Sequence, residues 1–166
     1  MNGEARDPVD GWIDALLIPR AGPSYDEIRG EALAQLLARG EEAHARIVER
    51  AGAADPPVQL LAVLPLFGRP EGVEVLRRAL ADGPGPTTVT AAHALARHPV
   101  PAALDALVAA LGSPRPQVVA SAAAGLAERG DPRSAEPLER ALDTAPDEAL
   151  PAVRRALERL RGGRGA

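Results

Sequence analysis

Leucines recur along this chain at a fixed interval, in several registers at once. The recurring positions are Leu64, Leu95, Leu126 and Leu157; Leu76, Leu107 and Leu138; and Leu80, Leu111 and Leu142. Around them, apolar residues follow the three- and four-residue spacing of amphipathic helices. A constant period of about 31 residues is the signature of a solenoid built from stacked helical repeats.

Each repeat reads as a pair of helices separated by a proline- or glycine-containing break. The pattern predicts helix pairs over residues 58–67 and 71–81, 88–97 and 102–111, and 118–129 and 133–142. A last helix is predicted over 148–160, in register with the first helix of each pair. Pro70, Pro101 and Pro132 repeat with the period of the leucines and fall at the start of each second helix, where a missing N–H costs nothing.

The period loosens toward the N-terminus. Ser24 and Glu27 have the spacing of a capping box, which predicts that a helix begins after Ser24. Its partner helix is expected over 41–51, so the repeat array covers residues 24–160. A short helix in residues 7–18 carries Trp12, and we interpret residues 1–23 as a cap on the first repeat. The alternative is that Trp12 docks on a partner. Residues 161–166 are expected to form a flexible tail.

Composition narrows the function classes. The net charge is −4, and no stretch is strongly basic, which argues against nucleic acid as a partner. Cysteine is absent, so disulfides, thiolate nucleophiles and cysteine-ligated metals are excluded. No signal peptide is visible and no apolar run reaches the roughly 18 residues of a membrane span. The expected protein is cytoplasmic and has no membrane partner.

No catalytic or metal-binding pattern emerges from the residues. The three histidines, His44, His93 and His98, lack metal-site spacing, and we interpret them as solvated or partly buried side chains. The four serines lie outside any Gly-x-Ser-x-Gly elbow. Because the chain has no lysine, it contains no phosphate-binding Gly-x-x-x-x-Gly-Lys loop. We therefore predict a protein that is not an enzyme and carries no catalytic residue, metal or cofactor.

The repeats resemble a known family. The best-matching segment, Pro114–Leu142, reads PRPQVVASAAAGLAERGDPRSAEPLERAL, with Pro-x-Pro between repeats and Gly-Asp-Pro between helices. This is similar to bacterial HEAT-like repeats of the phycobilisome-lyase type. The resemblance implies an all-α, right-handed α-solenoid of about five helix-pair repeats. It is specific for the fold and says little about function, because such proteins include lyases, scaffolds, adaptors and regulators.

One group of charged residues repeats with the period of the fold. Glu74, Asp105 and Glu136 lie one period apart on the second helices and form what we call the acidic ladder. The resemblance implies that second helices line the concave surface. The predicted partner-binding residues, all on these helices, are Glu74, Arg78, Asp105, Val108, Glu136 and Arg140. The alternative is a solvated polar face held by i,i+4 ion pairs.

These patterns favour a protein–protein interaction module, an adaptor, scaffold or regulatory subunit, that holds a protein or peptide on its concave face. A basic partner would match the acidic ladder. The alternatives are a chromophore lyase-like activity and a HEAT-like DNA glycosylase activity. Both would need aromatic residues at the site, and the chain has only Trp12, Tyr25 and Phe67. Because no helix follows 148–160, its stripe of Val153, Leu157 and Leu160 could leave an edge for self-association.

Overall fold

The computed structural model describes residues 7–19 and 22–163, and within these ranges every regular element is a helix. In chain order the α-helices are α1 (Pro8–Leu16), α2 (Pro23–Arg39), α3 (Glu41–Ala51), α4 (Val58–Phe67), α5 (Pro70–Asp82), α6 (Gly85–Arg97), α7 (Ala102–Ala110), α8 (Pro116–Arg129), α9 (Ala135–Thr144) and α10 (Leu150–Gly162). Two short 3₁₀ turns, Pro132–Ser134 and Asp147–Ala149, lead into α9 and α10.

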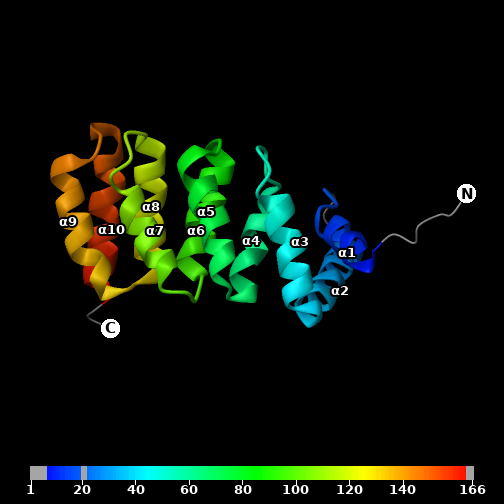
Figure 1. Ribbon diagram of the computed structural model, residues 1–166. Helices are drawn as coiled ribbons and strands as arrows, with labels where there is room; N and C mark the ends of the chain where they lie inside the picture. Colours follow the sequence, from blue (N-terminus) through cyan, green and yellow to red (C-terminus); the bar gives the residue numbers. More distant parts are fainter. Residues whose placement is uncertain (1–6, 20–21, 164–166) are drawn as a thin grey trace, which may run out of the picture.

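The helices stack side by side in chain order into an all-α solenoid (Figure 1). Four antiparallel pairs, α2–α3, α4–α5, α6–α7 and α8–α9, are followed by α10. The predicted pairs are therefore present, with boundaries shifted by a few residues. Gly68 and Gly130 end α4 and α8 in the left-handed conformation, with φ of +62° and +67°, which explains the glycine after those helices.

One continuous apolar core runs through the array. The periodic leucines Leu64, Leu95 and Leu126 are fully buried, as are Leu76, Leu107 and Leu138. The first set comes from the first helices of the pairs and the second set from the second helices, so the two sets meet between the layers. The repeating leucine pattern is therefore the pattern of the core.

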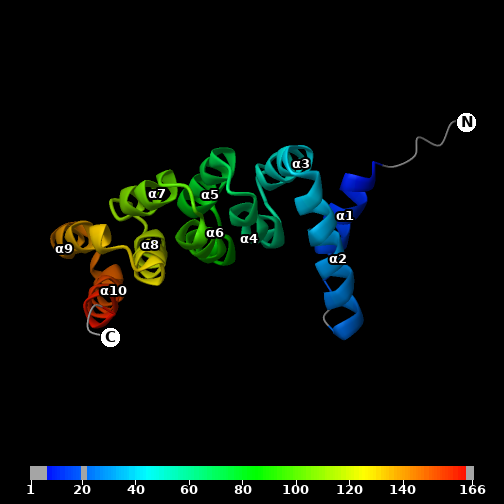
Figure 2. The ribbon, with the colours of Figure 1, turned by 90° about the horizontal axis from the view of Figure 1, so that it is seen from below.

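The solenoid is curved, and its two rows of helices differ in how closely they pack (Figure 2). The first helices, α4, α6, α8 and α10, form one row, and each packs directly against the next. The second helices, α5, α7 and α9, form the other row, in which neighbours are more widely separated. In Figure 2 the two ends of the molecule, at α2 and α10, bend toward the side of the first helices. We call the first helices the inner row and the second helices the outer row.

Small residues explain the close packing of the inner row. Ala91 of α6 and Ala122 and Gly125 of α8 are buried small residues of the inner row. A Cβ atom on Gly125 would lie 3.0 Å from the backbone oxygen of Ala92, so α6 and α8 approach each other as closely as a glycine allows. A row that packs closely on one side of a two-layer stack must lie on the inside of its curve. The concave side therefore follows from the position of the small residues.

The N-terminal helices form the other end of the stack. Helix α1 packs against α2 and α3 through Val9, Ile13 and Leu16, all of them buried. Arg50 of α3 pairs with Asp14 of α1 at 2.9 Å. Trp12 is half-buried, and the guanidinium of Arg39 lies 5.4 Å from the centre of its ring. The capping role of residues 1–23 stays a prediction, and residues 1–6, 20 and 21 lie outside the described ranges.

Three local expectations differ from the structure. Ser24 does not cap α2, because Pro23 already occupies the first turn and Gly22 is the N-cap. The predicted tail, residues 161–166, starts inside α10, which continues to Gly162, and residues 164–166 lie outside the described part. The stripe of Val153, Leu157 and Leu160 is buried against α8 and α9, so these three side chains do not form an exposed edge.

Candidate partner-binding site

The six predicted site residues lie together on the outer row. Glu74 and Arg78 are on α5, Asp105 and Val108 on α7, and Glu136 and Arg140 on α9. Val108 is partly buried and the other five are exposed. The expectation that this surface is concave is wrong, because the outer row lies on the convex side of the curve in Figure 2. Neighbouring helices of the outer row pack against each other less closely than those of the inner row.

The carboxylates of the acidic ladder are largely satisfied by arginines of the same helix. Glu74 accepts hydrogen bonds from Arg77 at 2.8 Å and from Arg78 at 2.9 Å. The bonds from Arg77 are the main reason that the pKa of Glu74 falls to about 2. Glu136 accepts a hydrogen bond from Arg140 at 2.6 Å. Because these carboxylates are paired, the ladder offers a partner little unpaired charge. Each exposed pair of this kind contributes about 0–1 kcal/mol to stability.

The inner row carries the larger hollow on this half of the molecule, over α6, α8 and α10. We call it the concave groove. Its lining residues are Val89, Ala92, His93, Gln117, Ala120, Ser121, Ala124, Ala127, Glu128, Ala152, Arg155, Ala156 and Arg159. The base is made largely by alanines, of which Ala92, Ala127 and Ala156 are buried. Polar side chains from each helix surround it, and the lining contains no Phe, Tyr or Trp.

Residues in and beside the groove repeat with the same period as the core. His93, Ala124 and Arg155 lie one period apart, and so do Arg97, Glu128 and Arg159. The imidazole Nδ1 of His93 pairs with the carboxylate of Glu128, which joins α6 to α8 across the groove. Arg155 and Arg159 of α10 are exposed and have no hydrogen-bond or ion-pair partner among the described residues. Sequence analysis missed this face because it followed the charged phase of the second helices alone.

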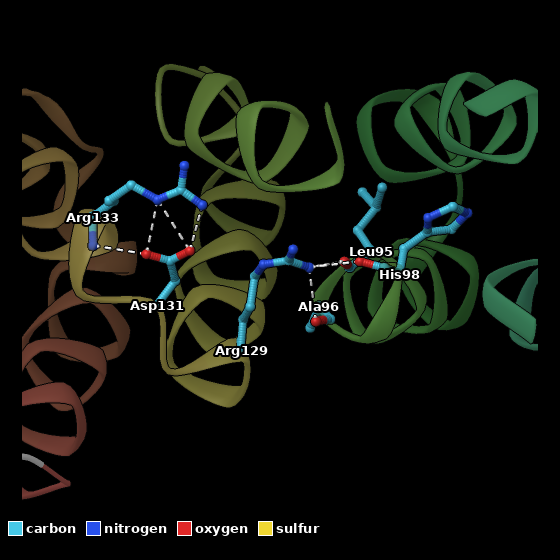
Figure 3. Close-up of polar contacts among 6 residues, drawn as sticks. All are labelled: Leu95, Ala96, His98, Arg129, Asp131 and Arg133. Atoms are coloured by element: carbon cyan, nitrogen blue, oxygen red, sulfur yellow. Dashed lines mark hydrogen bonds and ion pairs between the residues drawn. The ribbon is translucent and has the colours of Figure 1, made fainter. Parts of the chain in front are cut away.

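Buried arginine contacts fix the spacing between repeats beside the groove. Arg129, at the end of α8, donates to the backbone oxygens of Leu95, Ala96 and His98, at 3.3, 3.2 and 2.8 Å (Figure 3). These oxygens belong to the C-terminal end of α6, where helix carbonyls lack partners. The positive charge also suits the negative end of the helix dipole. The repeat pattern does not predict the role of Arg129, because His98 and Leu160 occupy the equivalent positions in the neighbouring repeats.

A similar contact ties α8 to the end of α5. Arg115, the N-cap of α8, donates to the backbone oxygens of Ala81 and Gly83, the latter at 2.9 Å. Figure 3 also shows Asp131 and Arg133 in the turn after α8, where Arg133 lowers the pKa of Asp131 to about 2. Asp131 accepts from the Arg133 backbone N–H at 2.9 Å and so starts the 3₁₀ turn before α9. The guanidinium groups of Arg115 and Arg129 thus bind backbone oxygens at helix ends and have a structural role.

The three histidines divide into two environments. His93 is exposed in the groove, whereas His44 and His98 are buried on the other side of the inner row. The Nε2 atoms of His44 and His98 each lie 3.5 Å from where a Cβ of Gly72 would be, and neither Nε2 has a hydrogen-bond partner. Burial is the main cause that lowers the pKa of both imidazoles below 6.5. Both are therefore neutral core residues at pH 7.

The described residues hold no cluster of three or more metal-ligating side chains. No helix within residues 7–19 and 22–163 is long and apolar enough to cross a membrane. The groove therefore presents to a ligand a hollow surface, two unpaired guanidinium groups and an imidazole–carboxylate pair.

Comparison with known proteins agrees with the fold. The family model for HEAT repeats matches residues 73–158, which is just over half of the chain and contains α6, α8 and most of α10. No curated protein matches the chain. The matched segment also contains α7, α9 and most of α5. The chain therefore belongs to the HEAT-repeat family.

Proposed function

We propose that this protein is a non-enzymatic interaction module, an adaptor, scaffold or regulatory subunit, that holds a segment of a partner protein in the concave groove. HEAT repeats commonly mediate protein–protein interaction and their fold is typically non-catalytic. The observation that carries the proposal is the groove itself, a hollow over three helices with an alanine base and unpaired polar side chains.

The character of the groove supports a macromolecular partner. It is open along three consecutive helices, whereas sites for small molecules usually enclose their ligand and are lined by aromatic or large apolar side chains. Alanines at its base let the backbone of a bound segment come close to the helices. The lining has no Phe, Tyr or Trp, which also disfavours the lyase-like and glycosylase activities, because these need a flat chromophore or base to be stacked.

The acidic ladder remains a second candidate surface for a partner. It is favoured by the regular spacing of Glu74, Asp105 and Glu136, and disfavoured by the arginines that already bind two of these carboxylates. In this alternative a basic partner would lie on the convex side, with Val108 at its centre and Arg78 and Arg140 at its margin.

A matched pair of tryptophan substitutions tests which row binds. Ala124 of α8 and Ala109 of α7 are both exposed, the first in the groove and the second on the outer row. Affinity capture from a lysate of cells that make the protein would compare the wild type with Ala124→Trp and Ala109→Trp. We expect the wild type and Ala109→Trp to retain the same partner and Ala124→Trp to lose it.

A second variant separates the two surfaces further. The triple variant Glu74→Arg, Asp105→Arg, Glu136→Arg reverses the acidic ladder and leaves the groove intact. It should retain the partner. Loss of the partner by this variant and by Ala109→Trp, with retention by Ala124→Trp, would contradict the proposal and assign binding to the outer row. Circular dichroism of all variants would confirm that none is unfolded.

A further inference from the structure

We infer that the segment bound in the concave groove is acidic, and that Arg155 and Arg159 pair with two of its carboxylates. The inference rests on the proposed function and adds the chemistry of the partner. It also reverses the charge that the acidic ladder would select, because the ladder requires a basic partner.

The first argument is that the groove contains positive charge without a partner. Arg155 and Arg159 both line it and both are exposed, and no described carboxylate lies within ion-pair distance of either. Arg161, also on α10, is by contrast held by Glu139 of α9 at 2.9 Å. Both guanidinium groups in the groove are therefore available to a partner, whereas that of Arg161 is engaged within the chain.

The second argument is that arginines outnumber carboxylates in the groove. Glu128 is the one carboxylate among the lining residues, and it pairs with His93. The charge that the groove presents to a partner is therefore positive, although the chain as a whole carries −4. Local charge of this kind selects partners of opposite charge and accelerates their encounter.

Geometry limits how the carboxylates can be arranged. Arg155 and Arg159 are four residues apart on a helix, which places their Cβ atoms about 5–6 Å from each other. Two acidic residues at positions i and i+4 of a helical segment have the same separation. Two at i and i+2 of an extended segment are about 6.6 Å apart. Arginine suits this role because its planar guanidinium can bind a carboxylate through two hydrogen bonds.

Protein carboxylates fit the groove better than phosphates of nucleic acid. Nucleic-acid affinity depends on many phosphate contacts, and residues 1–57, with 11 acids against 6 arginines, would repel a long polyanion. Single-stranded nucleic acid also binds by stacking on large aromatic side chains, and the groove contains no Phe, Tyr or Trp. A short acidic protein segment needs only the local positive charge.

Synthetic peptides test the inference without knowing the partner. Three labelled alanine-rich helical peptides of equal length would carry Glu, Gln or Lys at positions i and i+4, and binding would be followed by fluorescence anisotropy. We expect the wild type to prefer the Glu peptide over the Gln peptide by about ten-fold or more, the effect of one or two charge-assisted hydrogen bonds. The preference should weaken as salt is added.

Variants of α10 locate the effect. Arg155→Gln with Arg159→Gln should remove the preference for the Glu peptide, and Arg155→Glu with Arg159→Glu should transfer the preference to the Lys peptide. Arg154→Gln is the matched control, because Arg154 is exposed on the same helix but does not line the groove. It should behave as wild type.

The outcomes separate this inference from the proposed function. Equal binding of the Glu and Gln peptides, no binding of any peptide, or tighter binding of a single-stranded DNA oligonucleotide than of the Glu peptide would overturn the acidic-segment inference. The tryptophan capture experiment decides the groove itself. If Ala124→Trp loses the captured partner while Arg155→Gln with Arg159→Gln retains it, the groove is the binding site but the acidic-segment inference is wrong.

Discussion

The two rows of helices come from the same repeat, yet they differ in how closely their helices pack and in how their exposed charges are paired. The inner row uses alanine and glycine where α6 and α8 meet, so those helices approach closely and the row forms the inside of the curve. Both rows place leucines in the core, such as Leu95 of α6 and Leu107 of α7, but neighbouring helices of the outer row are more widely separated. Curvature therefore accompanies the closer approach of neighbouring helices in the inner row.

The rows also differ in how they treat exposed charge. On the outer row, Glu74 and Glu136 pair with arginines of their own helices. On the inner row, Arg155 and Arg159 lack a partner among the described residues. The comparison teaches that a regular series of charges is a weak sign of a binding site when most of its members pair within their own helices, as Glu74 and Glu136 do. Unpaired charge in a hollow is a stronger sign.

The largest expected effect comes from removing a large side chain that the outer row contributes to the core. Leu107 of α7 is fully buried, and Leu107→Ala should lower the free energy of unfolding by about 2–5 kcal/mol. In a linear array such a loss can uncouple the neighbouring repeats. Urea denaturation measures it. Leu66→Ala is the control, since Leu66 is 50% exposed and should change stability by less than about 0.5 kcal/mol. Equal effects at the two positions would contradict the packing described.

The next effect comes from the opposite change on the inner row, where a small residue is made large. Ala122 of α8 is fully buried and Ala124, two positions away, is exposed. Ala122→Leu should cost about 1–3 kcal/mol because α8 has no room to accommodate it. Ala124→Leu should cost less than about 0.5 kcal/mol. Thermal or urea unfolding would compare the two, and a tolerated Ala122→Leu would show that the inner row is not closely packed.

A pH-dependent effect distinguishes the buried histidines from the histidine in the groove. Burial holds the pKa of His44 and His98 below 6.5 in the folded protein, so the unfolded chain binds protons more readily. The stability that the neutral rings confer is complete above about pH 6.5 and is lost progressively as the pH falls toward the lowered folded pKa values. Glu71 opposes this effect at His44, while Arg69 and Arg129 add to it.

Urea midpoints at pH 7.5 and pH 5.5 would measure the loss. The double variant His44→Gln, His98→Gln should lose less stability between the two pH values than the wild type does. His93→Gln should lose as much as the wild type, because His93 is exposed in the groove. An undiminished loss in the double variant would assign the acid sensitivity to other groups.

The fold was largely predictable from the sequence, and the reason lies in particular residues. Because the leucine series fall in the core, their period alone predicted the helix pairs. The small residues Ala91, Ala122 and Gly125 also mark helix contacts in the sequence. They could have identified the inner row, since close contacts must lie on the inside of a curve. The resemblance to HEAT repeats implied the opposite assignment, with the second helices on the concave side.

The candidate site was less predictable, because it depends on pairing across space. The period places His93, Ala124 and Arg155 on one face, but nothing in the sequence shows that His93 pairs with Glu128 while Arg155 and Arg159 stay unpaired. The contacts of Arg115 and Arg129 with helix ends in the preceding repeat could not be predicted either, because every residue has a backbone oxygen and a sequence pattern does not distinguish the acceptors. The N-cap of α2 was misassigned because Pro23 begins the helix before Ser24.

A distance measurement decides most directly which row is concave. His93 and Arg155 lie two repeats apart on the inner row, and Glu74 and Glu136 lie two repeats apart on the outer row, with the same separation in sequence for both pairs. Since the chain has no cysteine, spin labels can be placed on His93→Cys with Arg155→Cys and on Glu74→Cys with Glu136→Cys. Electron–electron double resonance should give a shorter distance for the inner pair than for the outer pair. An equal or longer inner distance would contradict the assignment of the concave groove.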